Sequence, residues 1–183
     1  MIEIVHKVLT FKNKCVVLLT MRVLGIDPGT IITGFGVVED SGSRLSLIDY
    51  GAVKSGRNDP FPDRLKKIYE GLCRVFEKHT PDHVAVEKVF YGKSVKAAIK
   101  IGEGRGVAIL CAALAGVPLS EYSPTAIKKS VVGVGNAQKT QVQEMVKIIL
   151  QLSKLPEPLD SSDALAIAIC HCNRKKLDGL ING

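Results

Sequence analysis

The sequence contains no apolar stretch long enough to cross a lipid bilayer. Its most apolar early segment, Val16–Leu19, is far shorter than the ~20 residues of a membrane helix, and no small-residue cleavage site follows a long apolar core. Internal repeats and low-complexity tracts are absent as well. We therefore expect a cytoplasmic protein that has no membrane partner.

The chain also lacks the paired cysteine spacing of a disulfide framework. Its five cysteines, at positions 15, 73, 111, 170 and 172, are scattered through apolar segments, which favours reduced and mostly buried thiols. Cys170-His171-Cys172 resembles a metal cluster at first sight. Neighbours one and two apart on a helix diverge, however, and no second ligand pair exists, so we do not expect zinc there.

What the chain does have is an excess of basic residues. There are 25 Lys and Arg against 18 Asp and Glu, a formal net charge of +7, which favours a polyanionic partner such as nucleic acid. A length of 183 residues suits one domain with a full core. Met21 precedes the first strong strand pattern, so we expect the working domain to span 21–183. Residues 1–20 form a leader of uncertain status, either an appended strand or a start-site artefact.

The hydrophobic pattern predicts an α/β domain with a mixed five-stranded sheet flanked by helices. Three closely spaced strands form an antiparallel meander, and two more strands follow, each reached through a helix. This order is that of the ribonuclease H-like fold. The expected strands are 22–26, 34–39, 45–53, 83–89 and 118–122, and the expected helices are 60–78, 94–115, a short one from 125, 139–152 and 160–175.

Four acidic residues occupy the ends of these apolar elements: Asp27, Glu87, Asp160 and Asp163. Asp27 and Glu87 each end a buried strand, and an unpaired charge in such a place is costly. Asp160 and Asp163 stand three apart at a helix start and share one face. Taken singly, Asp27 could belong to a simple turn, Glu87 could be a surface residue, and Asp160 could serve the helix N-terminus.

As a set, the four acids predict a metal centre. Carboxylate oxygens are the ligands that Mg²⁺ prefers, and Mn²⁺ also accepts them. Two Mg²⁺ ions ~3.5–4 Å apart would activate a water and stabilise the leaving oxygen of a phosphodiester. An acidic site in a basic protein therefore predicts a nuclease.

Basic and aromatic residues flank the expected site. Residues 133–140 look like a phosphate loop, but Gln138 stands where that loop needs glycine, so we expect Lys139 to meet a DNA phosphate instead of ATP. Lys128 extends this basic patch. Phe90, on a loop after Glu87, could stack on an unpaired base, although an aromatic residue near a strand end usually belongs to the core.

Five segments in this order resemble the RuvC family of bacterial Holliday-junction resolvases. They are Gly25–Gly29, Val86–Phe90, Gly104–Ala108, Lys128–Gly133 and Asp160–Ala166, and the resemblance runs from about Met21 to Arg174. Residues 1–20 have no counterpart in it.

The resemblance implies a ribonuclease H-like homodimer that binds four-way junction DNA and nicks two opposed strands during recombination and repair. It assigns Asp27, Glu87, Asp160 and Asp163 as the magnesium-binding catalytic acids, with Asp160 replaced by histidine in some members. It also implies that Phe90 stacks on bases at the junction centre and that Lys128 and Lys139 contact DNA, with Lys139 stabilising the transition state. The helix at 94–115 would form part of the dimer interface. The RuvA–RuvB branch-migration complex is an expected partner.

Three other functions share some of these features. A sugar-kinase or actin-like ATPase begins with a similar strand and turn, but it needs a second phosphate loop and a second domain. A small nuclease acting on ribosomal RNA precursors shares the early motif but lacks the 128–133 segment. A junction-binding protein without catalysis would have no need of four acids at these positions.

Overall fold

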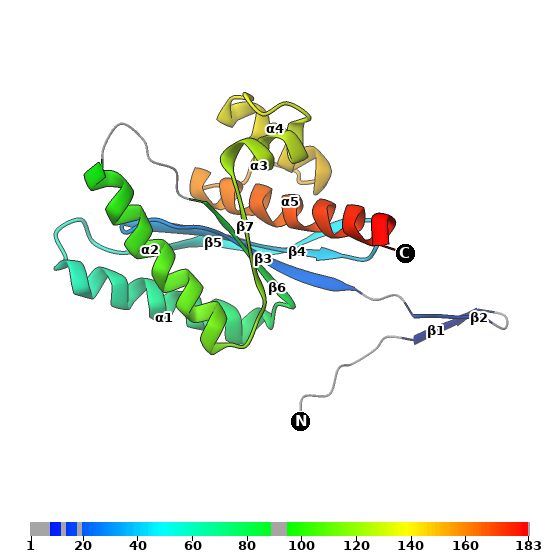
Figure 1. Cartoon of the computed structure of the whole chain (residues 1–183), viewed down its shortest axis with the longest axis horizontal. Coiled ribbons are helices and arrows are strands. Elements are labelled where there is room, and N and C mark those ends of the chain that lie inside the picture. Colours follow the sequence, from blue (N-terminus) through cyan, green and yellow to red (C-terminus); the bar gives the residue numbers. More distant parts are fainter. Residues whose placement is uncertain (1–7, 12–13, 18–19, 89–94, 183) are drawn as a thin grey trace.

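The structure is a computed structural model, and it describes residues 8–11, 14–17, 20–88 and 95–182. A mixed five-stranded sheet with strand order β5-β4-β3-β6-β7 forms its centre (Figure 1). Strands β3, β4 and β5 are antiparallel neighbours, whereas β6 pairs parallel with both β3 and β7. The sheet strands are β3 (Met21–Asp27), β4 (Ile32–Asp40), β5 (Leu45–Lys54), β6 (His83–Glu87) and β7 (Leu119–Tyr122).

Helices cover both faces of this sheet (Figure 1). Helices α1 (Phe61–His79) and α2 (Val95–Leu114) pack on one face. Helix α5 (Leu159–Asn182) crosses the other face, and α3 (Pro124–Val132) and α4 (Lys139–Ile149) pack against α5.

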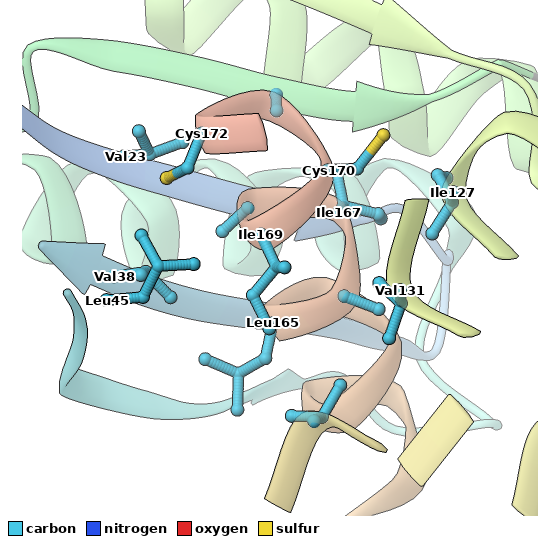
Figure 2. Packing of buried hydrophobic residues seen from close by; sticks show 14 of the residues in the cluster. Val23, Val38, Leu45, Ile127, Val131, Leu165, Ile167, Ile169, Cys170 and Cys172 are labelled. Carbon is cyan, nitrogen blue, oxygen red and sulfur yellow. The ribbon is translucent and has the colours of Figure 1, made fainter. Parts of the chain in front are cut away.

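The strands carry apolar residues on both sides, because both sides are covered. Along β3, Val23 belongs to the core under α5, whereas Leu24 and Ile26 belong to the core under α1 and α2. Figure 2 shows the first of these cores, in which Val23 and Val38 of the sheet face Leu165 and Ile169 of α5. Successive side chains of a strand point to opposite faces, so this alternation fixes the face of every other residue along the strand.

Helix ends follow the local sequence. Thr80 caps the end of helix α1, and its positive φ of 41° lets its backbone N–H donate to Phe76 O. The Ser123 side chain caps the start of α3 by accepting a hydrogen bond from the backbone N–H of Ala126. A capping box between Gln138 and Gln141 opens α4, which places Lys139 in the first turn of that helix.

The predicted order of sheet strands and helices and the mixed five-stranded sheet are confirmed. The largest difference in bounds is at α5, which extends to Asn182 and not to about residue 175. Residues 8–11 (β1) and 14–17 (β2) pair with each other as a separate two-stranded sheet, so the leader contains strands but none of the main sheet. No helix in the described ranges is long and apolar enough to span a membrane.

Candidate active site

Strand alternation aims Asp27 and Glu87 at the same face of the sheet. Asp27 lies four residues after Val23, and Glu87 lies two residues after Ala85, so each acid points to the same face of the sheet as that apolar residue. Both apolar residues lie under α5. Strands β3 and β6 are parallel neighbours, so their carboxyl ends meet at one edge. The two carboxylates therefore lie at this edge, facing the start of α5.

The turn that follows Asp27 is held from two sides. The Thr33 hydroxyl donates to Gly29 O at 2.7 Å, and the Ser55 hydroxyl donates to Thr30 O at 2.9 Å. Gly104 of α2 lies against the same turn, and a Cβ there would come 3.0 Å from Gly29 O. These contacts fix the backbone from which Asp27 projects.

Three glycines let α5 approach the sheet closely enough to bring its acids to the same edge. A Cβ on Gly25 would overlap Ala164 O, one on Gly34 would overlap Asp160 O, and one on Gly36 would lie 2.7 Å from the Leu165 side chain. The first turns of α5 therefore rest on the backbone of β3 and β4. Asp160 and Asp163 belong to these turns, and both are partly buried.

The electrostatics of the site show that the carboxylates are close enough to repel one another. Burial, with the charges of Asp163 and Glu87 next, raises the pKa of Asp27 from 3.8 to about 7, and Asp160 adds a smaller contribution in the same direction. Burial and the charge of Asp163 also raise the pKa of Glu87. A site that holds several carboxylates in a partly buried space favours a cation.

Lys139 supplies one positive charge to this group. Its Nζ lies 2.6 Å from Oδ2 of Asp163. Burial opposes the charge on Lys139, but the hydrogen bond that Lys139 donates to Asp163 and the charges of Asp163, Asp27 and Glu87 outweigh it and raise the lysine pKa. The charge of Lys139 lowers the pKa of Asp27, but burial and the neighbouring carboxylates outweigh it and keep this pKa near 7.

A pocket of about 190 Å³ opens beside these charges. Glu87, Asp163, Lys128 and Lys139 form its polar part, and its apolar part comes from α3, α4 and α5. The charge of Lys128 lowers the pKa of Glu87, opposing the effect of burial. Two of the four acids, both predicted basic residues and an apolar wall thus meet in one pocket.

The donor set fits a hard divalent cation on its chemistry. All four predicted ligands offer carboxylate oxygens, and a cation would offset the carboxylate repulsion that, after burial, raises the pKa of Asp27. In the described part of the chain, no three acidic, histidine or cysteine side chains yet surround a single point at ligand distances. Binding a cation would therefore require the carboxylate side chains to reorient.

Other predicted features have different outcomes. Phe90 lies outside the described residues, and Lys139 occupies the first turn of α4, as predicted. Cys170 and Cys172 are buried in the core, where Figure 2 shows their sulfurs on opposite sides of α5. His171 between them is also buried, with Nδ1 2.9 Å from the Tyr122 hydroxyl.

The sequence interpretation missed the role of the glycines under α5. Gly34 and Gly36 stand two apart in a strand, so they share one face, and this spacing was a readable sign of a close backbone approach. The apolar wall of the pocket was missed as well. Ile127 and Val142 come from separate helices, and no local pattern joins them.

The fold and the acidic edge define a nuclease-type site on a ribonuclease H-like sheet. The family model described as "Crossover junction endodeoxyribonuclease RuvC" matches residues 23–171, and this chain belongs to that family. The match confirms the resemblance, the fold class and the expected class of enzyme, a crossover junction endodeoxyribonuclease.

Individual relatives cover most of the chain. The crossover junction endodeoxyribonuclease RuvC of Chloroflexus aggregans is 52% identical over 151 residues, which is 82% of this chain and 92% of that protein. The RuvC protein of Trichlorobacter lovleyi is 52% identical over 157 residues, covering 86% and 88%. A solved structure of T. thermophilus RuvC in complex with Holliday junction substrate superposes with a TM-score of 0.82 at 35% identity, covering 86% of this chain and 96% of that one.

Proposed function

We propose that this protein resolves four-way DNA junctions by paired symmetric nicks that depend on a divalent metal, during homologous recombination and DNA repair. The observation that carries the proposal is the acidic edge, where Asp27 and Glu87 from neighbouring strands meet Asp163 from α5, whose charge raises the pKa of both. The T. thermophilus relative that superposes on this chain was solved with a Holliday junction.

Asp27, Glu87 and Asp163 would hold the metal. Asp160 would contribute from the edge of the group, since its charge has a smaller effect on the pKa of Asp27 than the charges of Asp163, Glu87 and Lys139. We propose two Mg²⁺ ions, with Mn²⁺ as an alternative. When bound, such ions supply an activated water and neutralise charge on the phosphate. The remaining work of catalysis falls to basic side chains.

Lys139 would take part in catalysis by donating to the scissile phosphate. A lysine whose raised pKa keeps it protonated is suited to stabilise negative charge that develops on phosphate oxygens. Lys128, which lines the same pocket, would bind the adjacent backbone. Phe90 would stack on a base at the junction centre.

A homodimer would place two such sites on one junction, with α2 forming part of its interface. Along α2, Ile99, Leu110 and Leu114 are 57, 51 and 67% exposed, which is unusual for residues of this type on one helix. A Cβ on Gly106 would meet nothing within 4 Å, so this part of the helix is open to a partner. Dimerisation would set the separation of the two cuts.

We also propose a cytoplasmic location and contact with the RuvA–RuvB branch-migration complex.

The experiment that tests this function separates binding from cleavage. Asp27→Asn keeps the size of the side chain and removes its charge, so the variant should bind a synthetic four-way junction and fail to cut it in Mg²⁺. Phe90→Ala should lower cleavage more than binding. Full cleavage by Asp27→Asn would refute the assignment of the site, and unchanged turnover by Phe90→Ala would return that residue to the core.

A further inference from the structure

A second hollow in the described part of the molecule lies away from the acids, between the edge strand β5 and helix α1. It has a volume of about 390 Å³, roughly twice that of the pocket at the acids. We call it the β5–α1 groove. Its charged lining consists of four cations, Lys54, Lys67, Arg74 and Lys78, and two acids, Asp49 and Glu70.

Two of the cations are fixed in place by acids. Lys78 Nζ lies 2.8 Å from Oδ2 of Asp49, which also lies 2.9 Å from Nε2 of the buried His79. Lys67 Nζ lies 2.8 Å from Oδ2 of Asp59. These pairs hold the two lysines along the groove and partly neutralise them.

The other two cations make no ion pair with any described residue. Lys54, at the end of β5, and Arg74, on α1, are both exposed to solvent. They carry the full positive charges of the groove. An anionic ligand would therefore find its strongest attraction at these two side chains.

The cations of α1 form a row. Lys67, Arg74 and Lys78 are seven and four residues apart, which puts them on one side of the helix, facing β5. From Lys67 to Lys78 the helix rises about 16 Å at about 1.5 Å per residue. A strand of DNA carries a phosphate about every 3.4 Å along the duplex axis, so this row matches a stretch of roughly five phosphates. A small anion would need only one point of this row.

The groove begins at the same edge of the sheet as the acids. Asp27 pairs with Gly34, and Gly34 pairs with Ala52 of β5, so Asp27 and Ala52 lie two strand spacings apart, about 10 Å. Because side chains alternate along β5, Ala52 and Lys54 lie on the same face of the sheet as Gly34 and the acids. Val53 lies on the opposite face, against α1. Lys54 therefore lies on the edge strand between the face of the sheet that carries the acids and the β5–α1 groove.

We infer that the β5–α1 groove binds the phosphate backbone of a duplex arm that extends outward from the cleaved strand. The inference rests on the proposed function, because it takes four-way junction DNA as the ligand. Lys54 receives the backbone as it leaves the acidic edge, and Arg74 holds it further along α1. Contacts of this kind orient an arm without reading its sequence.

The test compares two double variants that lose the same charge. Lys54→Gln/Arg74→Gln removes the two unpaired cations of the groove. Lys154→Gln/Lys175→Gln removes two exposed lysines outside both the groove and the acidic pocket. Binding of a fluorescent four-way junction is measured by anisotropy in EDTA, where no cleavage interferes, over a series of KCl concentrations. Circular dichroism shows that each variant is folded.

Near 0.1 M salt, the groove variant should bind the junction at least roughly tenfold more weakly than the wild type. The slope of the logarithm of the association constant against the logarithm of the salt concentration should become shallower by about 1.8, since each of the two lost phosphate contacts contributes about 0.9. The control variant should keep the wild-type slope. Equal slopes for the two double variants would overturn the groove assignment and leave the proposed function standing. Failure of the wild-type protein to bind any junction would instead overturn the proposed function, and the groove assignment with it.

Discussion

Replacing Asp27 by asparagine should stabilise the metal-free protein at neutral and alkaline pH while it abolishes cleavage. Burial and the neighbouring carboxylates raise the pKa of Asp27 to about 7 in the folded protein, from 3.8 in the unfolded chain. The folded state therefore prefers the protonated carboxyl. Above pH 7 it must hold an ionised group in an unfavourable place, and an uncharged amide removes this requirement.

The size and direction of the effect follow from proton linkage. As the pH rises from about 4 to about 7, the unfolded chain has released the Asp27 proton and the folded protein still holds it, so stability falls across this window. A pKa difference of about 3 corresponds to about 4 kcal/mol, at about 1.36 kcal/mol for each pKa unit. Asparagine also loses hydrogen bonds to water on burial, so we expect a net gain of about 2 kcal/mol at pH 8.

Urea denaturation in EDTA at pH 8 and at pH 4 measures this gain. Burial lowers the pKa of His171 to about 4, so its titration favours the folded state as the pH rises from about 4 to 6.5, but this effect is common to both proteins and cancels in the difference. Added Mg²⁺ should then stabilise the wild-type protein more than the variant, because it binds the native acids. An asparagine variant that is less stable than the wild type at pH 8, or that gains equally at pH 4 and pH 8, would refute the reasoning.

Three further predictions concern the surroundings of the site. Gly25→Ala should lower the free energy of unfolding by about 1–3 kcal/mol and reduce cleavage, because the new methyl group pushes α5 off the sheet. The control Gly179→Ala should not destabilise the protein, because a Cβ there meets nothing within 4 Å. Equal melting temperatures for the two variants would contradict this account. Lys139→Met should raise the pKa of Asp27 above about 7 in metal-free protein, since the lysine charge lowers it, and a carboxyl NMR titration that gives the wild-type value would show that the lysine does not act on it. Leu110→Asp should convert a dimer to a monomer in sedimentation experiments and abolish paired nicks; a dimer that persists would place the interface elsewhere.

The fold could be read from the sequence because each sheet strand and main helix has its own pattern. The apolar run that ends in Asp27 and the helical spacing of Leu65, Ile68, Leu72 and Val75 leave few alternatives. The end of α5 was placed too early. Its last turns carry charged residues and Gly179, which are weak helix signals. Their apolar residues Leu180 and Ile181 are 81 and 76% exposed, so this segment does not pack on the core and lacks the apolar stripe by which a helix is recognised in a sequence.

The residues of the candidate site were found by type and position, but their interactions were not. The ion pair between Lys139 and Asp163 joins residues 24 apart on two helices, and no local pattern encodes such a contact. The pKa of Asp27 depends on charges from β6 and α5 that meet it only in the folded protein. The β5–α1 groove was missed for the same reason, because Lys54 and Arg74 become neighbours only when α1 packs beside the edge strand.

The most direct test of the central claim is a cleavage assay on a synthetic, immobile four-way junction in Mg²⁺, beside a linear duplex of the same sequence. The account predicts symmetric nicks in two opposed strands of the junction, none in the duplex, and none in either DNA when EDTA replaces the metal. Binding without nicks across a range of junction sequences, with Mn²⁺ also supplied, would contradict the account and make the protein a junction-binding protein without catalysis.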